Sequence, residues 1–163
     1  VLTYNWPLRS FANYIQQLEM ESLGKPFNAE SIFHETGQTI FGGFGSTAQH
    51  SYFQLLHQGT SQASADIIYS PSVQSPLSSA QAQGQASLLY SPQNQSSNLL
   101  ELTNGNIPLN LFVLPKLSLK ELGFLLATWE HRVFVTASLL QINPFDQFGV
   151  AAGKKVAQKF LKK

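Results

Sequence analysis

Hydrophobic residues recur along the chain with two spacings, one typical of helices and one typical of buried strands. Near the amino terminus, apolar side chains at helical spacing form one stripe: Leu8, Phe11, Ala12, Ile15 and Leu18. Pro7 suits the first turn of this helix, and Gly24 suits its end. Short apolar runs at residues 1–4 and 65–69 instead predict strands.

Capping residues indicate two more helices towards the carboxyl terminus. Ser118 and Glu121 have the spacing of a capping box. The long helix that follows has apolar residues on one side: Leu122, Leu125, Leu126, Trp129 and Val133. The Asn143–Pro144 pair ends it, and a last helix is expected at about 146–163. Strands alternating with helices predict an α/β three-layer sandwich with a mostly parallel central sheet, as one domain over residues 1–163.

Three segments between these elements carry less regular patterns. Residues 39–41 predict a strand that leads through a glycine turn into a helix carrying both His50 and His57, with Ser46 or Thr47 as its cap. The uncharged, Gln- and Ser-rich stretch between residues 70 and 97 predicts a helix at about 77–89. Finally, residues 98–102 and 110–114 predict strands around the Asn104–Gly105 turn.

Composition narrows the classes of function. The 163 residues are 43% hydrophobic and carry a formal net charge of +1, so we expect one globular domain with no nucleic-acid or membrane partner. Half of the ten basic residues lie in the last ten positions, where a solvated helix face is favoured over a nucleic-acid or lipid patch. Without cysteine there is no disulfide, thiolate metal site or Cys nucleophile. His50 and His57 are two helical turns apart, too far for joint metal ligation.

Candidate chemistry begins at residues 16–25, where the first long helix ends. Gln17 and Glu21 are four residues apart, so their side chains share a helix face. A carboxylate in a closed site can act as a base near neutral pH. An ordinary solvated acid at a helix end has the same spacing, and the spacing alone favours that alternative.

Two other segments hold polar groups next to glycines. Residues 43–50 form a glycine-rich turn before a helix, where free N–H groups suit anions, but no Lys-Ser or Lys-Thr pair follows as in a Walker loop. By itself, His50 is more typical of a packed or surface histidine than of a catalyst. In residues 145–154, Gln147 and Lys154 are seven apart and share a helix face. A glutamine that caps the helix and a lysine that is a surface charge would have the same spacing.

Taken jointly, the three segments resemble motifs of the glucose-6-phosphate isomerase family. Residues 16–25 resemble its Gln-Gln-x-x-Met-Glu-Ser-x-Gly-Lys stretch. Residues 43–60 resemble its Gly-x-x-Gln-His-x-x-x-Gln-x-x-His-Gln-Gly block. Residues 145–154 are similar to its Phe-Asp-Gln-x-Gly-Val-Glu-x-x-Lys signature, with Glu130-His131-Arg132-Val133-Phe134-Val135 before it.

The resemblance implies an aldose–ketose isomerisation of glucose 6-phosphate and fructose 6-phosphate through a cis-enediol, without metal or organic cofactor. Glu21 would be the base, and His50, supplied by the partner in a homodimer, would assist ring opening. Lys154 would contact the ring-opening region, and Gln17 and Gln147 would position the substrate. The expected location is the cytoplasm.

Two departures qualify this expectation. Ala151 stands where the signature has Glu, which we expect to alter side-chain pairing rather than abolish the reaction. Neither Arg9 nor Arg132 lies in a Gly-Gly-Arg motif, which family members carry in a preceding domain. Because the chain begins at Val1 and its one methionine is Met20, we expect it to be the C-terminal part of a larger enzyme, with little or no activity alone. Two alternatives remain open: a non-catalytic sugar-phosphate-binding module, and a structural or extracellular signalling role.

Overall fold

A computed structural model gives the fold of residues 1–72, 76–92 and 96–161. Parts of the Gln- and Ser-rich stretch and of the last predicted helix lie outside these described residues, namely 73–75, 93–95 and 162–163. The chain divides into two units, each built from two stretches of sequence. Unit 1 comprises Val1–Ile15 and Phe41–Leu125, and unit 2 comprises Gln16–Ile40 and Leu126–Lys163.

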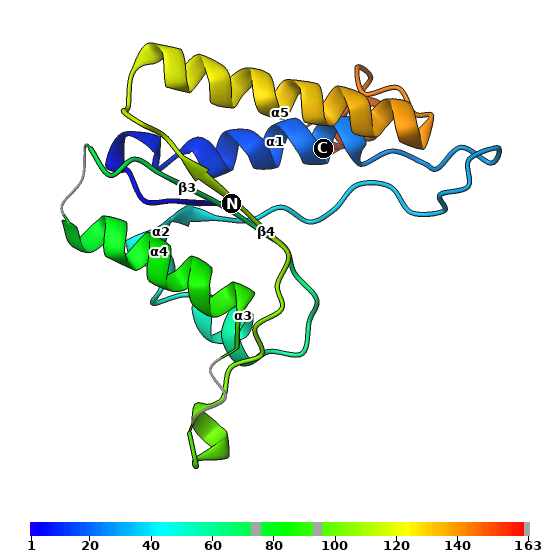
Figure 1. Cartoon of the computed structure of the whole chain (residues 1–163). Helices are drawn as coiled ribbons and strands as arrows, with labels where there is room; N and C mark the ends of the chain where they lie inside the picture. Colours follow the sequence, from blue (N-terminus) through cyan, green and yellow to red (C-terminus); the bar gives the residue numbers. More distant parts are fainter. Residues whose placement is uncertain (73–75, 93–95, 162–163) are drawn as a thin grey trace. The chain divides into compact units, whose positions relative to one another are not determined.

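Unit 1 contains a four-stranded parallel sheet with the strand order β2-β1-β3-β4 (Figure 1). The strands are β1 (Leu2–Thr3), β2 (Gly43–Phe44), β3 (Ala65–Tyr69) and β4 (Leu109–Val113). All five residues of β3 are buried, because this strand pairs along both edges and is covered on both faces. The predicted strands near residues 1–4, 65–69 and 110–114 are therefore confirmed, and so is the parallel sheet.

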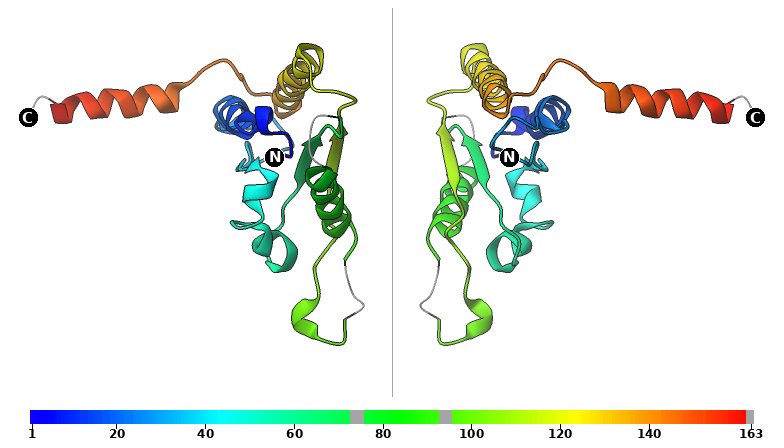
Figure 2. Two further views of the ribbon diagram at one scale, coloured as in Figure 1. Left: turned by 90° about the vertical axis from the view of Figure 1, so that its left-hand side faces the viewer. Right: turned by 90° about the vertical axis from the view of Figure 1, so that its right-hand side faces the viewer.

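Helices cover both faces of the sheet in unit 1. Helices α2 (Gly45–Ala48), α3 (Phe53–Gln58) and α4 (Pro76–Tyr90) lie on one side, with α4 along β3 and β4 (Figures 1 and 2). Their apolar side chains pack with the sheet in one cluster: Leu2, Tyr4, Ala48, Phe53, Leu56, Ile67, Tyr69, Ala82, Ala86 and Leu89. On the other side begin α1 (Phe11–Leu23) and α5 (Leu119–Leu140). This arrangement is the predicted three-layer sandwich.

Helix α1 follows a short 3-10 helix, η1 (Trp6–Leu8), which has Pro7 in its first turn. As the stripe predicts, Phe11, Ala12 and Ile15 of α1 are buried. Helix α5 begins at the predicted capping box, where the Ser118 hydroxyl donates a hydrogen bond to the Glu121 carboxylate. This hydrogen bond holds the pKa of Glu121 below its usual value.

Unit 2 contains the carboxyl-terminal parts of α1 and α5, followed by α6 (Phe148–Leu161). A small apolar cluster joins α1 to α5: Leu23, Val133 and Ala137, with Leu18 and Ile142 against them. Helix α5 ends through Gln141, whose left-handed backbone (φ 56°) lets Ile142 N–H donate to the Ala137 carbonyl at 3.0 Å. All residues of α6 are exposed within the described part of the chain.

The helix predicted to carry both His50 and His57 is wrong as one element. Helix α2 ends at Ala48, α3 begins at Phe53, and the turn between them holds His50. Neither predicted cap is used, because the Ser46 hydroxyl donates to the side-chain oxygen Oε1 of Gln81 at 3.0 Å and Phe44 occupies the N-cap position. The two histidines therefore do not share a helix face.

Two predicted strands are also wrong. Residues 39–41 are not a strand; the pairing with β1 begins at Gly43, which lies opposite Leu2. Within residues 98–102, the chain forms a 3-10 helix, η2 (Leu99–Glu101), because the Asn98 side chain accepts a hydrogen bond from Leu100 N–H at 3.0 Å. That local bond competes with an extended strand.

Gly45 is required where α2 crosses the Tyr4 ring. A Cβ at residue 45 would lie 2.3 Å from Cζ of Tyr4, whereas a Cβ at Gly43 would meet nothing within 4 Å. We expect Gly45→Ala to lower the free energy of unfolding by about 1–3 kcal/mol, because the buried ring or α2 must shift. Gly43→Ala should change it by less than about 0.5 kcal/mol. Urea unfolding of both variants measures this, and equal effects would contradict the packing described.

Candidate active site

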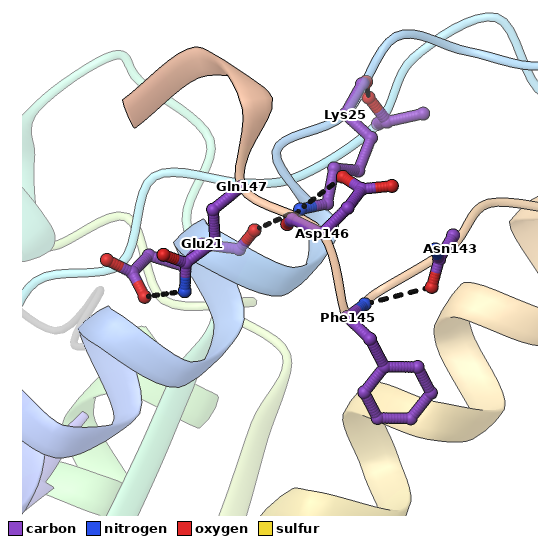
Figure 3. Close-up of polar contacts among 7 residues, drawn as sticks. Glu21, Lys25, Asn143, Phe145, Asp146 and Gln147 are labelled. Atoms are coloured by element: carbon purple, nitrogen blue, oxygen red, sulfur yellow. Dashed lines mark hydrogen bonds and ion pairs between the residues drawn. The ribbon is translucent and has the colours of Figure 1, made fainter. Parts of the chain in front are cut away.

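Unit 2 brings together two of the site residues that the sequence predicts. Glu21 lies near the carboxyl end of α1, and Gln147 directly precedes α6, 126 positions later. The Gln147 amide donates a hydrogen bond to Oε2 of Glu21 at 3.0 Å (Figure 3). Glu21 is partly buried, and the amide leaves its other carboxylate oxygen available. A carboxylate oriented in this way can accept a proton from a bound molecule.

Lys25 connects the same two segments, and the sequence analysis did not select it. Its ammonium group donates to the main-chain oxygen of Glu21 at 2.8 Å and to the main-chain oxygen of Asp146. It also lies 3.3 Å from Oδ1 of Asp146, with the Lys25 side chain only 10% exposed (Figure 3). The signal was present in the sequence. Lys25 follows Glu21 by four residues at a helix end, where lysines bind the last carbonyls, and Asp146 adjoins Gln147.

The chain that follows α1 is also attached at Lys25. The Thr36 hydroxyl donates to the Lys25 main-chain oxygen. The Asn28 amide donates to the Gln141 main-chain oxygen at 3.3 Å, just after α5. In the segment that leads to Gln147, Phe145 N–H donates to the Asn143 side chain at 3.0 Å (Figure 3). These bonds hold the loops on both sides of the Glu21–Gln147 pair.

A buried ion pair lies two residues before Glu21. The Glu19 side chain is 1% exposed, and its Oε1 lies 3.5 Å from Nε of Arg132 on α5. Its other oxygen accepts a hydrogen bond from the Gln38 amide at 2.9 Å. Since a buried carboxylate is costly unless it is paired, this contact ties α1 to α5 and to the loop that ends unit 2's first stretch.

Gln17 and Lys154, by contrast, are exposed. Gln17 lies one turn before Glu21 on α1. Lys154 lies on α6, two turns beyond Gln147, which is about 10 Å along a helix axis. Within the described residues, no hydrogen bond or ion pair is found for the Lys154 side chain. Ala151, one turn after Gln147, is exposed and forms a main-chain hydrogen bond to Gln147 at 3.1 Å.

His50 belongs to unit 1, where its exposed side chain lies in the turn between α2 and α3. The main-chain N–H of His50 donates to the Thr47 main-chain carbonyl at 3.1 Å. Burial raises the pKa of Tyr4 to about 12 and also raises the pKa of Tyr52, which lies in the same turn.

The described part of the chain contains no group of three or more His, Cys, Asp or Glu side chains placed to hold a metal ion. Among the helices of that part, none combines the length and the apolar character needed for a bilayer crossing.

The fold is an α/β domain of the three-layer, parallel-sheet class. It carries a hydrogen-bonded carboxylate–amide pair, Glu21 and Gln147. The model of the phosphoglucose isomerase family matches residues 1–163, which is the whole chain. The chain therefore belongs to the phosphoglucose isomerase family.

Individual relatives agree with this assignment. Glucose-6-phosphate isomerase of Shewanella loihica is 38% identical over 187 positions that cover 99% of this chain and 34% of the relative. The enzyme of Idiomarina loihiensis is 36% identical, with coverage of 99% and 37%. The chain thus spans about a third of the length of the curated relatives it matches.

Solved structures agree as well. The crystal structure of a glucose-6-phosphate isomerase from Chlamydia trachomatis has a TM-score of 0.85 and 30% identity, covering 99% of this chain and 34% of that one. The structure of hypothetical protein TT0462 from Thermus thermophilus has a TM-score of 0.80 at 21% identity, over 99% of this chain and 40% of that one. The second likeness supports the fold alone.

The Glu19–Arg132 pair gives a test of the framework around the site. We expect Arg132→Met to lower the free energy of unfolding by about 3 kcal/mol, because it leaves the Glu19 carboxylate buried without its cation. Arg9→Met is the matched control, since Arg9 is exposed and its side-chain contacts are local: a hydrogen bond to the Trp6 main-chain oxygen and a cation–π contact with the Trp6 ring. Chemical unfolding of the two variants compares them. If Arg132→Met cost no more than Arg9→Met, the pair would not be holding α1 to α5.

Proposed function

We propose that the protein is an aldose–ketose isomerase that interconverts glucose 6-phosphate and fructose 6-phosphate, and that this chain supplies part of its catalytic site. One observation carries the proposal. In a member of the phosphoglucose isomerase family, the carboxylate of Glu21 meets the Gln147 amide across two distant motifs. Both residues are the ones that the family resemblance implies for this chemistry.

The proposed reaction moves one proton between neighbouring carbons. The Glu21 carboxylate removes the C2 proton of the open-chain aldose, which gives a cis-enediol, and returns a proton to C1 to give the ketose. The hydroxyl proton at O2 is lost and O1 gains one, so the atoms balance. The Gln147 amide orients Glu21 and, with Gln17, positions the substrate. Placing a base within hydrogen-bonding reach of its proton is a large part of such catalysis.

Ring opening is assigned to His50 and Lys154. Both side chains are exposed, so both are accessible to a bound sugar or to another chain. In the proposed homodimer, His50 acts in the site of the partner chain, and Lys154 acts from α6 in its own site. Cations and hydrogen-bond donors at this site would stabilise the charge that develops on the enediolate.

The remainder of the enzyme is also part of the proposal. The curated relatives are far longer than this chain, which supports a preceding domain with phosphate-binding segments and a Gly-Gly-Arg arginine. Apolar residues of α6 such as Val156 and Phe160 are exposed here and are suited to pack against further protein. We expect the enzyme to bind its sugar phosphates in the cytoplasm.

A non-catalytic sugar-phosphate-binding module is the alternative, and Glu21 distinguishes the two. In the complete enzyme, Glu21→Gln should lower kcat by about 10²- to 10⁴-fold with KM little changed, because the amide cannot accept the proton. Glu30→Gln, at an exposed glutamate of unit 2, is the control. An assay from fructose 6-phosphate, coupled to a dehydrogenase that reports glucose 6-phosphate, measures both. Wild-type turnover in Glu21→Gln would show that Glu21 is not the base.

The isolated chain gives a second test. We expect residues 1–163 alone to show little or no isomerase activity in the same coupled assay, because the phosphate-binding segments and the arginine would be missing. Circular dichroism should first establish that the chain is folded. Turnover close to that of a complete enzyme would contradict the assignment of this chain as part of a site.

A further inference from the structure

We propose that Lys25 is a positioning residue for the isomerisation: its ammonium holds the Asp146–Gln147 segment against α1, and thereby keeps the Gln147 amide on the Glu21 carboxylate. This inference rests on the proposed function and adds residues that the family resemblance did not assign in this chain. Lys25 and Asp146 act through Glu21 and Gln147 and do not themselves need to touch the sugar.

The first support is the matching of donors and acceptors at Lys25. An ammonium group has three N–H donors. Three acceptors surround this one: the Glu21 main-chain oxygen at 2.8 Å, the Asp146 main-chain oxygen, and Oδ1 of Asp146 at 3.3 Å. With 10% of the side chain exposed, water competes weakly for these bonds. The contact is therefore stronger than a surface ion pair, which is worth little.

The second support is the position of Gln147 in the chain. Its side chain is exposed, and it lies between a loop and a helix whose residues are all exposed. An exposed glutamine on an unanchored segment would lose much rotamer freedom to keep one hydrogen bond. Two of the three Lys25 contacts are to Asp146, which is joined to Gln147 by a peptide bond. Fixing Asp146 therefore also restricts Gln147.

The third support is the choice of ionic partner for Lys25. Oppositely charged side chains four residues apart near a helix end commonly pair with each other. Here the Lys25 ammonium contacts the main-chain oxygen of Glu21 and takes the Asp146 carboxylate as its ionic partner. The ammonium of Lys25 is therefore paired with Asp146 and not with the Glu21 carboxylate. The hydrogen-bond partner of the Glu21 carboxylate is the neutral Gln147 amide.

The test is a double-mutant cycle in the complete enzyme. Lys25→Met removes all three donors and keeps an unbranched side chain. We expect it to lower kcat about 10- to 100-fold, because the Glu21–Gln147 geometry is lost. In a Gln147→Met background the same substitution should change kcat less than about twofold, because Gln147 is then no longer there to be positioned. A purely structural role would lower kcat by the same factor in both backgrounds, and that result would overturn the proposal.

Two further variants keep the test decisive. Asp146→Asn removes the negative charge that pairs with Lys25 and retains both the side-chain and the main-chain acceptor oxygens, so its effect should be smaller than that of Lys25→Met and should also vanish in the Gln147→Met background. It replaces Lys25→Met in the cycle if that variant does not fold, as judged by circular dichroism. Lys120→Met, at an exposed lysine of α5, is the control and should match the wild type.

The outcomes separate this inference from the proposed function. If the wild-type enzyme does not interconvert the two sugar phosphates, the proposed function fails and this inference fails with it. If the wild type is active and Glu21→Gln is not, while the Lys25 and Gln147 effects simply multiply, the function stands and the positioning role of Lys25 is excluded.

Discussion

Unit 1 depends on one buried strand. Strand β3 pairs with β1 and β4, and all five of its residues are buried, so its apolar side chains stabilise the core on both faces of the sheet. Where β1 and β3 end, Asn5 and Ser70 exchange two buried hydrogen bonds, of 2.7 and 3.2 Å. These bonds determine where the chain leaves β1, and hence where η1 and α1 begin. The buried strand therefore determines the start of the helix that carries Glu21.

In unit 2, charged side chains form ion pairs around the end of α1. Three ionisable side chains near the end of α1 have different partners. Glu19 is buried and pairs with Arg132, and Lys25 pairs with Asp146. Glu21 accepts a hydrogen bond from a neutral amide, that of Gln147. Paired charges are held firmly when they are withdrawn from water, and they then fix the backbone between them. Glu21 lies between two such anchors and is itself only partly buried. This arrangement suits a proton acceptor that must stay in place and still reach a bound molecule.

The sequence predicted regular elements well and irregular ones poorly. The strand at residues 65–69 was predicted correctly because burial on both faces leaves a continuous apolar run, and the stripe on α1 because burial on one face imposes the helical period. The strands predicted at 39–41 and 98–102 failed because local features decide those segments: the pairing of Gly43 with β1, and the Asn98 cap of η2. The break between α2 and α3 carries no Gly or Pro between Gln49 and Tyr52 that would have indicated it.

For the candidate site, the resemblance to the family motifs selected Glu21 and Gln147, and in the structure the Gln147 amide lies 3.0 Å from Oε2 of Glu21. The resemblance did not select their anchors. Lys25 and Asp146 are 121 positions apart, and a contact of that range leaves no periodic signal in one sequence. Glu19 also resembles an ordinary charged residue on a helix until its burial is known. The sequence therefore indicated candidate residues, while the contacts that hold them in place required the fold.

In the proposed function, the Glu21 carboxylate meets the reacting carbons of a sugar phosphate. A crystal structure of the complete enzyme with bound fructose 6-phosphate tests this role most directly. We expect a Glu21 oxygen within about 3 Å of the C1–C2 unit between whose carbons the proton moves, with Gln147 still bound to the carboxylate. A sugar phosphate bound in a cavity that Glu21 does not reach would contradict it.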